Sequence, residues 1–398
     1  MESTLRLYHT LVEVLSQHRN WLDLRHLKTL AWMMVGLIQS GMISLTAWAP
    51  YVHSRATYAQ STVRRFARWL NNLRIEAHQL YGPLIQQALV EWGDSRLYLA
   101  LDTSTISGAY CLVRISVIYR GRAVPLVWRV LERESTSVAY ELYKDLLDQA
   151  ARLLPLHCEV VLLADRGFAD IRLMRHLKRL GWHWRIRIKK NFWVYRHGQR
   201  RLKVGSIPLA RGQAQFWQEV FITEQRYGPV HLALARPGGS RESWYVVSDE
   251  LTGLATFNEY GLRFDIEENF LDDKSNGFQL ESSLVRSAEA LTRLCFVLAM
   301  TTLYLVCQGT AVVEEGKRRF VDPHWFRGSS YLPVPVLWVK VGWNWIKAAL
   351  VRGWELLSRL RLSGEPDPEP ARAAKTEDRH RAQPDLSMMI VRYGRCLT

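Results

Sequence analysis

Four residues that can bind metal or phosphate recur at short intervals in one stretch of strong helix formers. The stretch YGLRFDIEENFLDDK has no proline and only one glycine, near its start. The four residues are Tyr260, Arg263, Glu267 and Lys274. At about 100° per helical residue they fall at roughly 0°, 300°, 340° and 320°, on one narrow stripe. A carboxylate there can bind a metal ion, and the cations can bind phosphate. The alternative is a solvated helix surface with short-range ion pairs.

Two aspartates end apolar runs that are typical of buried strands. Asp102 closes RLYLALD and is followed by small hydroxyl residues, and Asp165 closes EVVLLAD before Arg-Gly. In an α/β sheet, chemistry gathers at the carboxyl ends of strands, so we expect both aspartates at one sheet edge. The alternative for either residue alone is a strand-end turn or a helix cap.

Together with Glu267, these aspartates give three carboxylates from three separate elements. Carboxylate oxygens are the ligands that Mg²⁺ prefers, and a pair of such ions can cleave phosphodiesters. We therefore predict that Asp102, Asp165 and Glu267 are both the catalytic residues and the metal ligands.

The same residues resemble the Asp-Asp-Glu triad of bacterial insertion-sequence transposases. Tyr260, Arg263, Glu267 and Lys274 match the Y-x2-R-x3-E-x6-K signature of the insertion-sequence-four family at every spacing. The stretches at 165–167 (DRG), 274–277 (KSNG) and 322–330 (DPHWFRGSS) also look like text of this family. The resemblance runs from about residue 95 to about residue 350. The four-residue signature is specific, whereas the lone Asp motifs are not.

The resemblance implies a fold, an activity and partners. The fold is a ribonuclease-H-like α/β core interrupted by a β-rich insertion. The activity is cleavage and joining of DNA at the element's ends with two Mg²⁺ ions, for which Mn²⁺ can substitute, and with Asp102 bridging the two. Tyr260, Arg263 and Lys274 would contact phosphates near the transferred end. A homodimer assembled on paired DNA ends is also expected.

Composition agrees with a nucleic-acid partner. The 398 residues carry 53 Lys and Arg against 38 Asp and Glu, a net charge of +15 that favours polyanions, although a membrane surface or a ribosome would attract it as well. The five cysteines form no C-x-x-C pair, which indicates a reducing compartment without a zinc site. We expect no signal peptide and no membrane segment, and a cytoplasmic, nucleoid-associated location in a bacterium.

The order of elements divides the chain into five parts. Residues 1–95 have helical patterns and form a predicted DNA-binding domain. Residues 96–190 alternate as three strands, helix, strand, helix and strand, the order of a ribonuclease-H-like core, although periodicity alone indicates only α/β. Residues 191–256 are β-like and form the insertion. Residues 257–350 complete the core, and 351–398 add a helix end, a Pro-rich charged linker and a tail.

Further DNA contacts are candidates by residue type and position. Arg64 and Arg65 lie on the second helix of a possible helix-turn-helix, where the alternative is a solvated bundle face. Lys189 and Lys190 end a predicted core strand. Trp244 is a candidate for stacking on a flipped base, with Trp193 and Trp217 as others and core packing as the alternative.

Two other functions stay open at this point. One is a ribonuclease-H-like nuclease that cuts DNA without strand transfer. The other is a DNA-binding relic with an inactive site, against which the complete triad and signature argue.

Overall fold

The computed structural model describes residues 2–18, 21–54, 56–238, 242–276, 278–323, 338–366, 368 and 390–394. Gly277, most of the predicted 322–330 motif including Arg327, and nearly all of the predicted Pro-rich linker lie outside these residues.

The predicted α/β core is built on five strands. They are β1 (Arg96–Ile106), β2 (Tyr110–Tyr119), β3 (Arg122–Glu132), β4 (Glu159–Ala164) and β5 (His183–Arg187), in the spatial order β3-β2-β1-β4-β5. Strand β2 runs antiparallel to both neighbours, whereas β4 and β5 run parallel to β1. All ten residues of β2 are buried, as expected of a strand covered on both faces. This order and direction confirm the predicted ribonuclease-H-like core.

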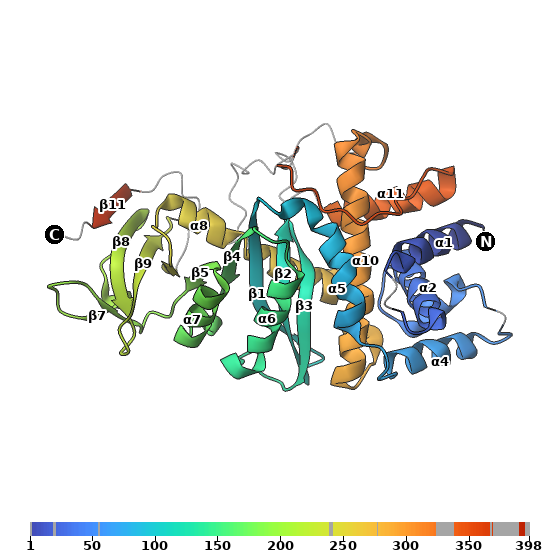
Figure 1. Cartoon of the computed structure of the whole chain (residues 1–398), viewed down its shortest axis with the longest axis horizontal. Helices are drawn as coiled ribbons and strands as arrows, with labels where there is room; N and C mark the ends of the chain where they lie inside the picture. Colours follow the sequence, from blue (N-terminus) through green and yellow to red (C-terminus); the bar gives the residue numbers. More distant parts are fainter. Residues whose placement is uncertain are drawn as a thin grey trace.

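Two helices connect the strands, and the second has a capping residue at each end. Helix α6 (Lys144–Leu153) follows β3, and α7 (Ile171–Leu180) lies between β4 and β5 (Figure 1). Asp170 caps α7 by accepting a hydrogen bond from the Arg172 backbone N–H. Gly181 ends it in the left-handed conformation, with φ of 71°.

The insertion extends the core sheet rather than forming a separate one. It comprises β6 (Trp193–Tyr195), β7 (Leu202–Lys203), β8 (Gln213–Ile222), β9 (Tyr227–Arg236) and β10 (Trp244–Ser248). Strand β10 pairs antiparallel with β5, so one sheet continues as β5-β10-β9-β8-β6-β7. A last strand, β11 (Ile390–Gly394), pairs with β8 at the far end of the molecule (Figure 1).

The remaining helices form the other side of the molecule. They are α1 (Glu2–Ser16), α2 (Leu24–Ser40), α3 (Leu45–Trp48), α4 (Ala59–Leu70), α5 (Ala77–Ala88), α10 (Ala288–Glu314) and α11 (Trp338–Arg352). Helix α10 stands between the sheet and the N-terminal helices (Figure 1), and the apolar faces of both sides belong to one buried cluster. By length and composition α10 could cross a membrane, but 94% of its most apolar window is buried inside the protein.

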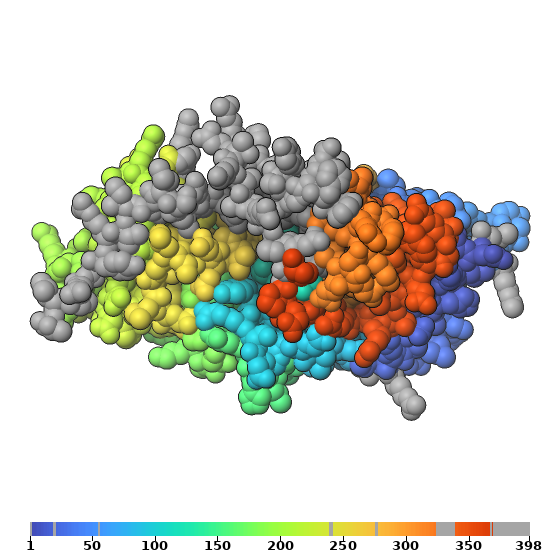
Figure 2. All heavy atoms as spheres, turned by 90° about the horizontal axis from the view of Figure 1, so that it is seen from above, coloured from blue at the N-terminus to red at the C-terminus, as the bar shows by residue number. Residues whose placement is uncertain are grey.

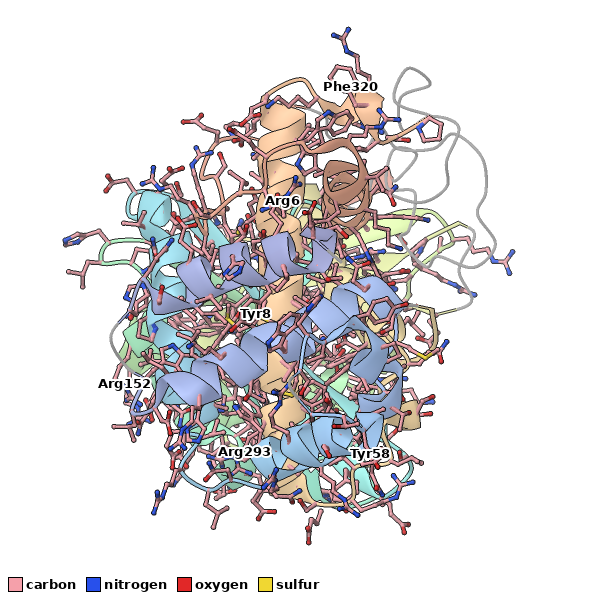
Figure 3. The ribbon with its side chains drawn as sticks, turned by 90° about the vertical axis from the view of Figure 1, so that its right-hand side faces the viewer. Arg6, Tyr8, Tyr58, Arg152, Arg293 and Phe320 are labelled. Atoms are coloured by element: carbon pink, nitrogen blue, oxygen red, sulfur yellow. The ribbon has the colours of Figure 1, made fainter. Side chains whose placement is uncertain are left out.

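Two arginines, one half-buried and one buried, connect the N-terminal helices to the rest. Arg293 of α10 donates hydrogen bonds to the Leu70 and Ile75 carbonyls at 3.0 and 3.2 Å (Figure 3). Arg6 of α1 donates to the carbonyls of Ala349 and Trp354 after it, at 2.6 and 2.7 Å. Figure 2 shows α10 and α11 packed directly beside the N-terminal helices.

Several predicted elements differ from the structure. Helix α5 lies in the region predicted as helical and contains Gly82-Pro83 in its middle; burial of side chains on both sides of that pair outweighs its helix-breaking preference. The first helix of the possible helix-turn-helix is a single turn, α3, followed by a 3₁₀ turn through Pro50. The predicted single helix over 260–274 consists of α8 (Leu254–Gly261), α9 (Phe264–Leu271) and a π-helical turn over Asp272–Asn276.

Candidate active site

The first two carboxylates lie side by side on parallel strands. Leu101 of β1 pairs with Ala164 of β4, so the next residues along each strand, Asp102 and Asp165, are neighbours at the same level of the sheet. Neighbouring strands are about 4.8 Å apart, which brings the two side chains within reach of a shared ion. Asp102 is not at the strand end as predicted, because β1 continues its ladder with β2 to Ile106, beyond the end of β4.

Arg263 joins the third carboxylate to the first. Its guanidinium donates to Asp102 Oδ2 at 2.9 Å and also to Glu267 Oε1. The arginine side chain is 4% exposed, compared with 15% for Asp102 and 46% for Glu267. Asp102, Asp165 and Glu267 are thus brought to one place, with a buried cation among them.

The pKa of Asp102 depends on the charges of the other two carboxylates. Burial raises the pKa of Asp102 from 3.8 to about 6, which Arg263 and the Thr103 backbone N–H oppose, and Glu267 and Asp165 raise it further. Burial acts to lower the pKa of Arg263, but Tyr260, Asp102, Glu267 and Asp165 together raise it, so the arginine stays charged.

The other two signature residues take different positions. Lys274 is half-buried, and its Nζ lies 3.4 Å from Thr105 Oγ1 on β1, so it faces the active-site strand. Burial lowers the pKa of Lys274. Tyr260 is fully buried, with its ring 5.4 Å from that of Trp244 and 5.7 Å from the Arg263 guanidinium. In this conformation Tyr260 therefore packs beneath Arg263 instead of facing solvent on the predicted stripe.

Arg114 is a residue near the site that the sequence reasoning missed. It is 3% exposed, stands opposite Asp102 across β1 and β2, and binds Asn269 and Asp273 beyond the end of the Glu267 turn. Its signal was a lone charge inside the apolar run YCLVRISVIY, because a buried strand rarely carries a charge without a partner.

The further DNA-contact candidates lie in different environments. Lys189 and Lys190 are exposed just beyond β5, at the same sheet edge as Asp165. Arg64 is exposed on α4, whereas Arg65 is half-buried there, and burial lowers its pKa. Trp244 is 3% exposed and packs against Phe257 and Tyr260. For Trp244 the structure supports core packing over base stacking.

A surface of aromatic and basic side chains covers part of the insertion. Trp193 and Tyr195 alternate with buried Val194 on β6, and Tyr195 pairs with Phe221, which is 38% exposed. Three cations lie over these rings: Arg201 and Lys203 at 4.6 and 5.4 Å from the Trp193 ring, and Arg226 at 5.0 Å from the Tyr195 ring. We call this set the insertion platform.

A second group of potential metal ligands lies at the opposite end of the core strands from Asp165. Ligand atoms of Glu159, His183 and Glu250 all lie within 4.8 Å of one another. Glu159 begins β4, six residues before Asp165, which is roughly 20 Å along a strand. Arg96 binds both Glu159 and Glu250, and Arg185 donates to Glu250 at 2.7 Å. These arginines neutralise the carboxylates, so the group ties β10 to the core and is separate from the predicted metal site.

The comparisons with known proteins identify the domain. Residues 112–304, just under half of the chain, match the family model described as Transposase DDE domain. This part of the chain is therefore similar to the DDE domain of transposases. The matched region includes Asp165 and Glu267, and it begins ten residues after Asp102. A search of curated proteins finds no match.

Among solved structures, the chain is similar to a piggyBac transposase in a synaptic complex with hairpin DNA. The identity is 11%, the TM-score is 0.45, and the alignment covers 89% of this chain and 78% of the other.

The donors of the DDE domain suit divalent metal ions. All three carboxylates are hard oxygen ligands, and Asp102 and Glu267 pair with a buried positive charge in the described structure, so the site already stabilises a cation. Asp102 and Asp165 would hold a shared ion, and Glu267 would complete the shell of one ion.

We predict that Asp102→Asn stabilises the metal-free protein in a pH-dependent manner. Because the folded-state pKa of Asp102 is raised, binding of a proton to this carboxyl stabilises the folded wild type. That stabilisation is lost once the pH exceeds about 6, whereas below about 4 the carboxyl is protonated in both folded and unfolded chains. Urea unfolding in EDTA should show the variant more stable by about 3 kcal/mol above pH 7, with the difference shrinking toward pH 4. An advantage that is constant across this range would contradict the burial of Asp102 as described.

Proposed function

We propose that this protein is a bacterial transposase of the insertion-sequence-four type, which binds the ends of its element and cuts and joins DNA. The observation that carries the proposal is the convergence of Asp102, Asp165 and Glu267 around Arg263, within a domain that matches the DDE transposase model. Its DNA substrate places it with the nucleoid in the cytoplasm.

The carboxylates have distinct parts in this chemistry. Two Mg²⁺ ions, or Mn²⁺ in their place, would activate the attacking oxygen and stabilise the leaving oxygen of the phosphodiester when bound. Asp102 and Asp165 are fixed by their strands, so they provide the rigid part of the ligand set. Glu267 is half-exposed on a short helix, so it is the ligand that can adjust as the DNA enters.

Arg263 changes partners in the proposed reaction. In the structure its guanidinium neutralises Asp102 and Glu267. With metal bound to those carboxylates, a DNA phosphate beside the scissile bond would take over as the counter-charge of Arg263. A guanidinium binds phosphate and carboxylate with the same two-point geometry, which makes this exchange chemically simple. Lys274 lies across β1 and adds a second phosphate contact.

Three surfaces support DNA binding outside the active site. Lys189 and Lys190 extend the positive charge of the sheet edge that carries Asp165. Arg64 lies exposed on α4 and suits contact with the backbone of the end. The insertion platform offers half-buried aromatic rings next to cations, a combination that binds unpaired or splayed bases.

Cleavage of a labelled DNA that carries the element's own ends tests the catalytic assignment. In Mg²⁺ the parent should nick at the ends, and Glu267→Gln should reduce the rate by at least ~100-fold, because the metal loses a charged ligand. Glu268→Gln is the matched control, since it removes the adjacent carboxylate and should stay within a few-fold of the parent. Cleavage without joining would favour a nuclease, and binding without cleavage would favour an inactive relic.

Substitution of the insertion platform should weaken DNA binding without affecting the metal site. Trp193→Ala removes the ring beneath Arg201 and Lys203, and the Kd for end DNA should rise by roughly tenfold, the value of one stacked base. Fluorescence anisotropy measures the Kd. Phe320→Ala, which removes an exposed aromatic at the tip of α10 (Figure 3), serves as control. Equal Kd values for all three proteins would rule out the platform as a DNA contact.

A homodimer on paired ends is part of the same proposal. The protein should elute as a dimer in size-exclusion chromatography coupled to light scattering when end DNA is present, because two ends must be cut together for joining. Scrambled DNA of equal length is the control. A monomer with both DNAs would exclude this assembly.

A further inference from the structure

Two buried arginines on the core sheet lack solvent and therefore require partners. Arg114 on β2 is 3% exposed and Arg122 on β3 is 2% exposed. Removing a guanidinium from water costs several kcal/mol unless it is paired and hydrogen-bonded. The partners of both come from the segment immediately after the Glu267 helix turn, and we call Arg114, Arg122, Asp272 and Asp273 the arginine clamp.

Arg114 makes three contacts with consecutive turns of that segment. Its guanidinium donates to Asp273 Oδ2 and to Asn269 Oδ1, both at 2.6 Å, and lies 4.2 Å from the centre of the Phe270 ring. Asn269 and Asp273 are 3% and 2% exposed, so the whole contact is dry. Because both terminal nitrogens of the planar guanidinium are hydrogen-bonded, the contact fixes the rotation of α9 as well as its distance from the sheet.

Arg122, one strand further on, makes a single ion-pair contact with the same segment. Its Nε lies 3.0 Å from Asp272 Oδ2, so two consecutive aspartates are anchored to two neighbouring strands. The backbone at these aspartates leaves α-helical geometry and forms the π-helical turn Asp272–Asn276. Such wide turns are frequent at functional sites because they redirect the residues that follow. Here the redirected residue is Lys274, whose Nζ reaches Thr105 on β1.

The clamp is aligned with the catalytic aspartate through the sheet. Arg114 stands directly opposite Asp102 in the antiparallel register of β1 and β2. Asp102 and Arg114, which anchors the helix of Glu267, therefore lie at the same level of the sheet. A buried ion pair adds little net stability compared with apolar residues of the same shape, so stability alone does not account for this pair.

We propose that Arg114, acting through Asn269 and Asp273, is a positioning residue that sets Glu267 and Lys274 in register with Asp102. This inference rests on the proposed function, because it takes Glu267 as a metal ligand. Loss of the arginine leaves the three carboxylates in the chain but lets the Glu267 helix rotate on the sheet.

The test compares metal binding with folding. The double variant Arg114→Met, Asp273→Leu leaves no unpaired buried charge, and Arg114→Lys keeps the charge beside Asp273 while losing the bond to Asn269. Titration of the free protein with Mn²⁺, followed by electron paramagnetic resonance, measures affinity, and urea unfolding measures folding. Cleavage assays with varied DNA concentration separate kcat from KM.

We expect the double variant to unfold at the urea concentration of the parent or higher, while its Mn²⁺ affinity falls by about 10–100-fold, as for loss of other supporting contacts of metal ligands. The kcat for cleavage should fall with KM for DNA unchanged, and Arg114→Lys should give intermediate values. The control Arg293→Met removes a buried arginine remote from Glu267, and it should lower the unfolding midpoint without changing Mn²⁺ affinity.

The outcomes separate this inference from the proposed function. If Glu267→Gln weakens Mn²⁺ binding but both Arg114 variants bind as the parent does, the positioning role is wrong and the proposed function stands. If Mn²⁺ binding is indifferent to Glu267→Gln itself, the metal assignment fails and the inference fails with it. A double variant that does not fold leaves Arg114→Lys to decide, and parent-like Mn²⁺ binding in that variant overturns the role.

Discussion

Three carboxylates can converge in a half-buried site only if a positive charge lies among them. Without one, mutual repulsion and lost hydration would force the acids to bind protons or the helix to move away. Arg263 supplies that charge from inside the chain, with bonds to Asp102 and Glu267. The close approach of α9 to β1 depends on this contact. An internal cation thus holds the first and third carboxylates together.

The rest of the fold positions β1 and α9 so that Arg263 can bind both Asp102 and Glu267. Parallel pairing of β1 and β4 fixes Asp102 beside Asp165, and β1 cannot shift because β2 and β3 lie beyond it in the same ladder. On the helix side, Tyr260 and Trp244 pack beneath Arg263, so the insertion contributes to the floor of the site. Helix α10 covers β3 and connects the N-terminal helices to the core in one apolar cluster. The catalytic residues thus depend on elements from every part of the described chain.

Some of this architecture is readable from the sequence, and some depends on tertiary contacts that no local pattern records. Apolar runs ending at Asp102 and Asp165 predict the two central strands, because burial on both faces leaves a distinct pattern. Periodicity over 260–274 predicts a helix but not its interruption, since the aspartates of the π-helical turn pair with Arg114 and Arg122 on distant strands. The burial of Trp244 is likewise a consequence of packing against Phe257 and Tyr260, so residue type alone left its role open.

The continuous sheet from β1 to β6 fixes the distance between Asp102 and the insertion platform. Six strand steps separate the aspartate strand from the platform strand, through β4, β5, β10, β9 and β8. At about 4.8 Å per step this is roughly 29 Å before twist shortens it, or about eight to nine nucleotides at 3.4 Å each. Because the strands are joined by backbone hydrogen bonds rather than by a hinged linker, the sheet acts as a molecular ruler. Under the proposed function, the spacing between the bond that is cut and the bases that contact the platform would be a property of the strand count, and adding or removing a hairpin would change it in discrete steps.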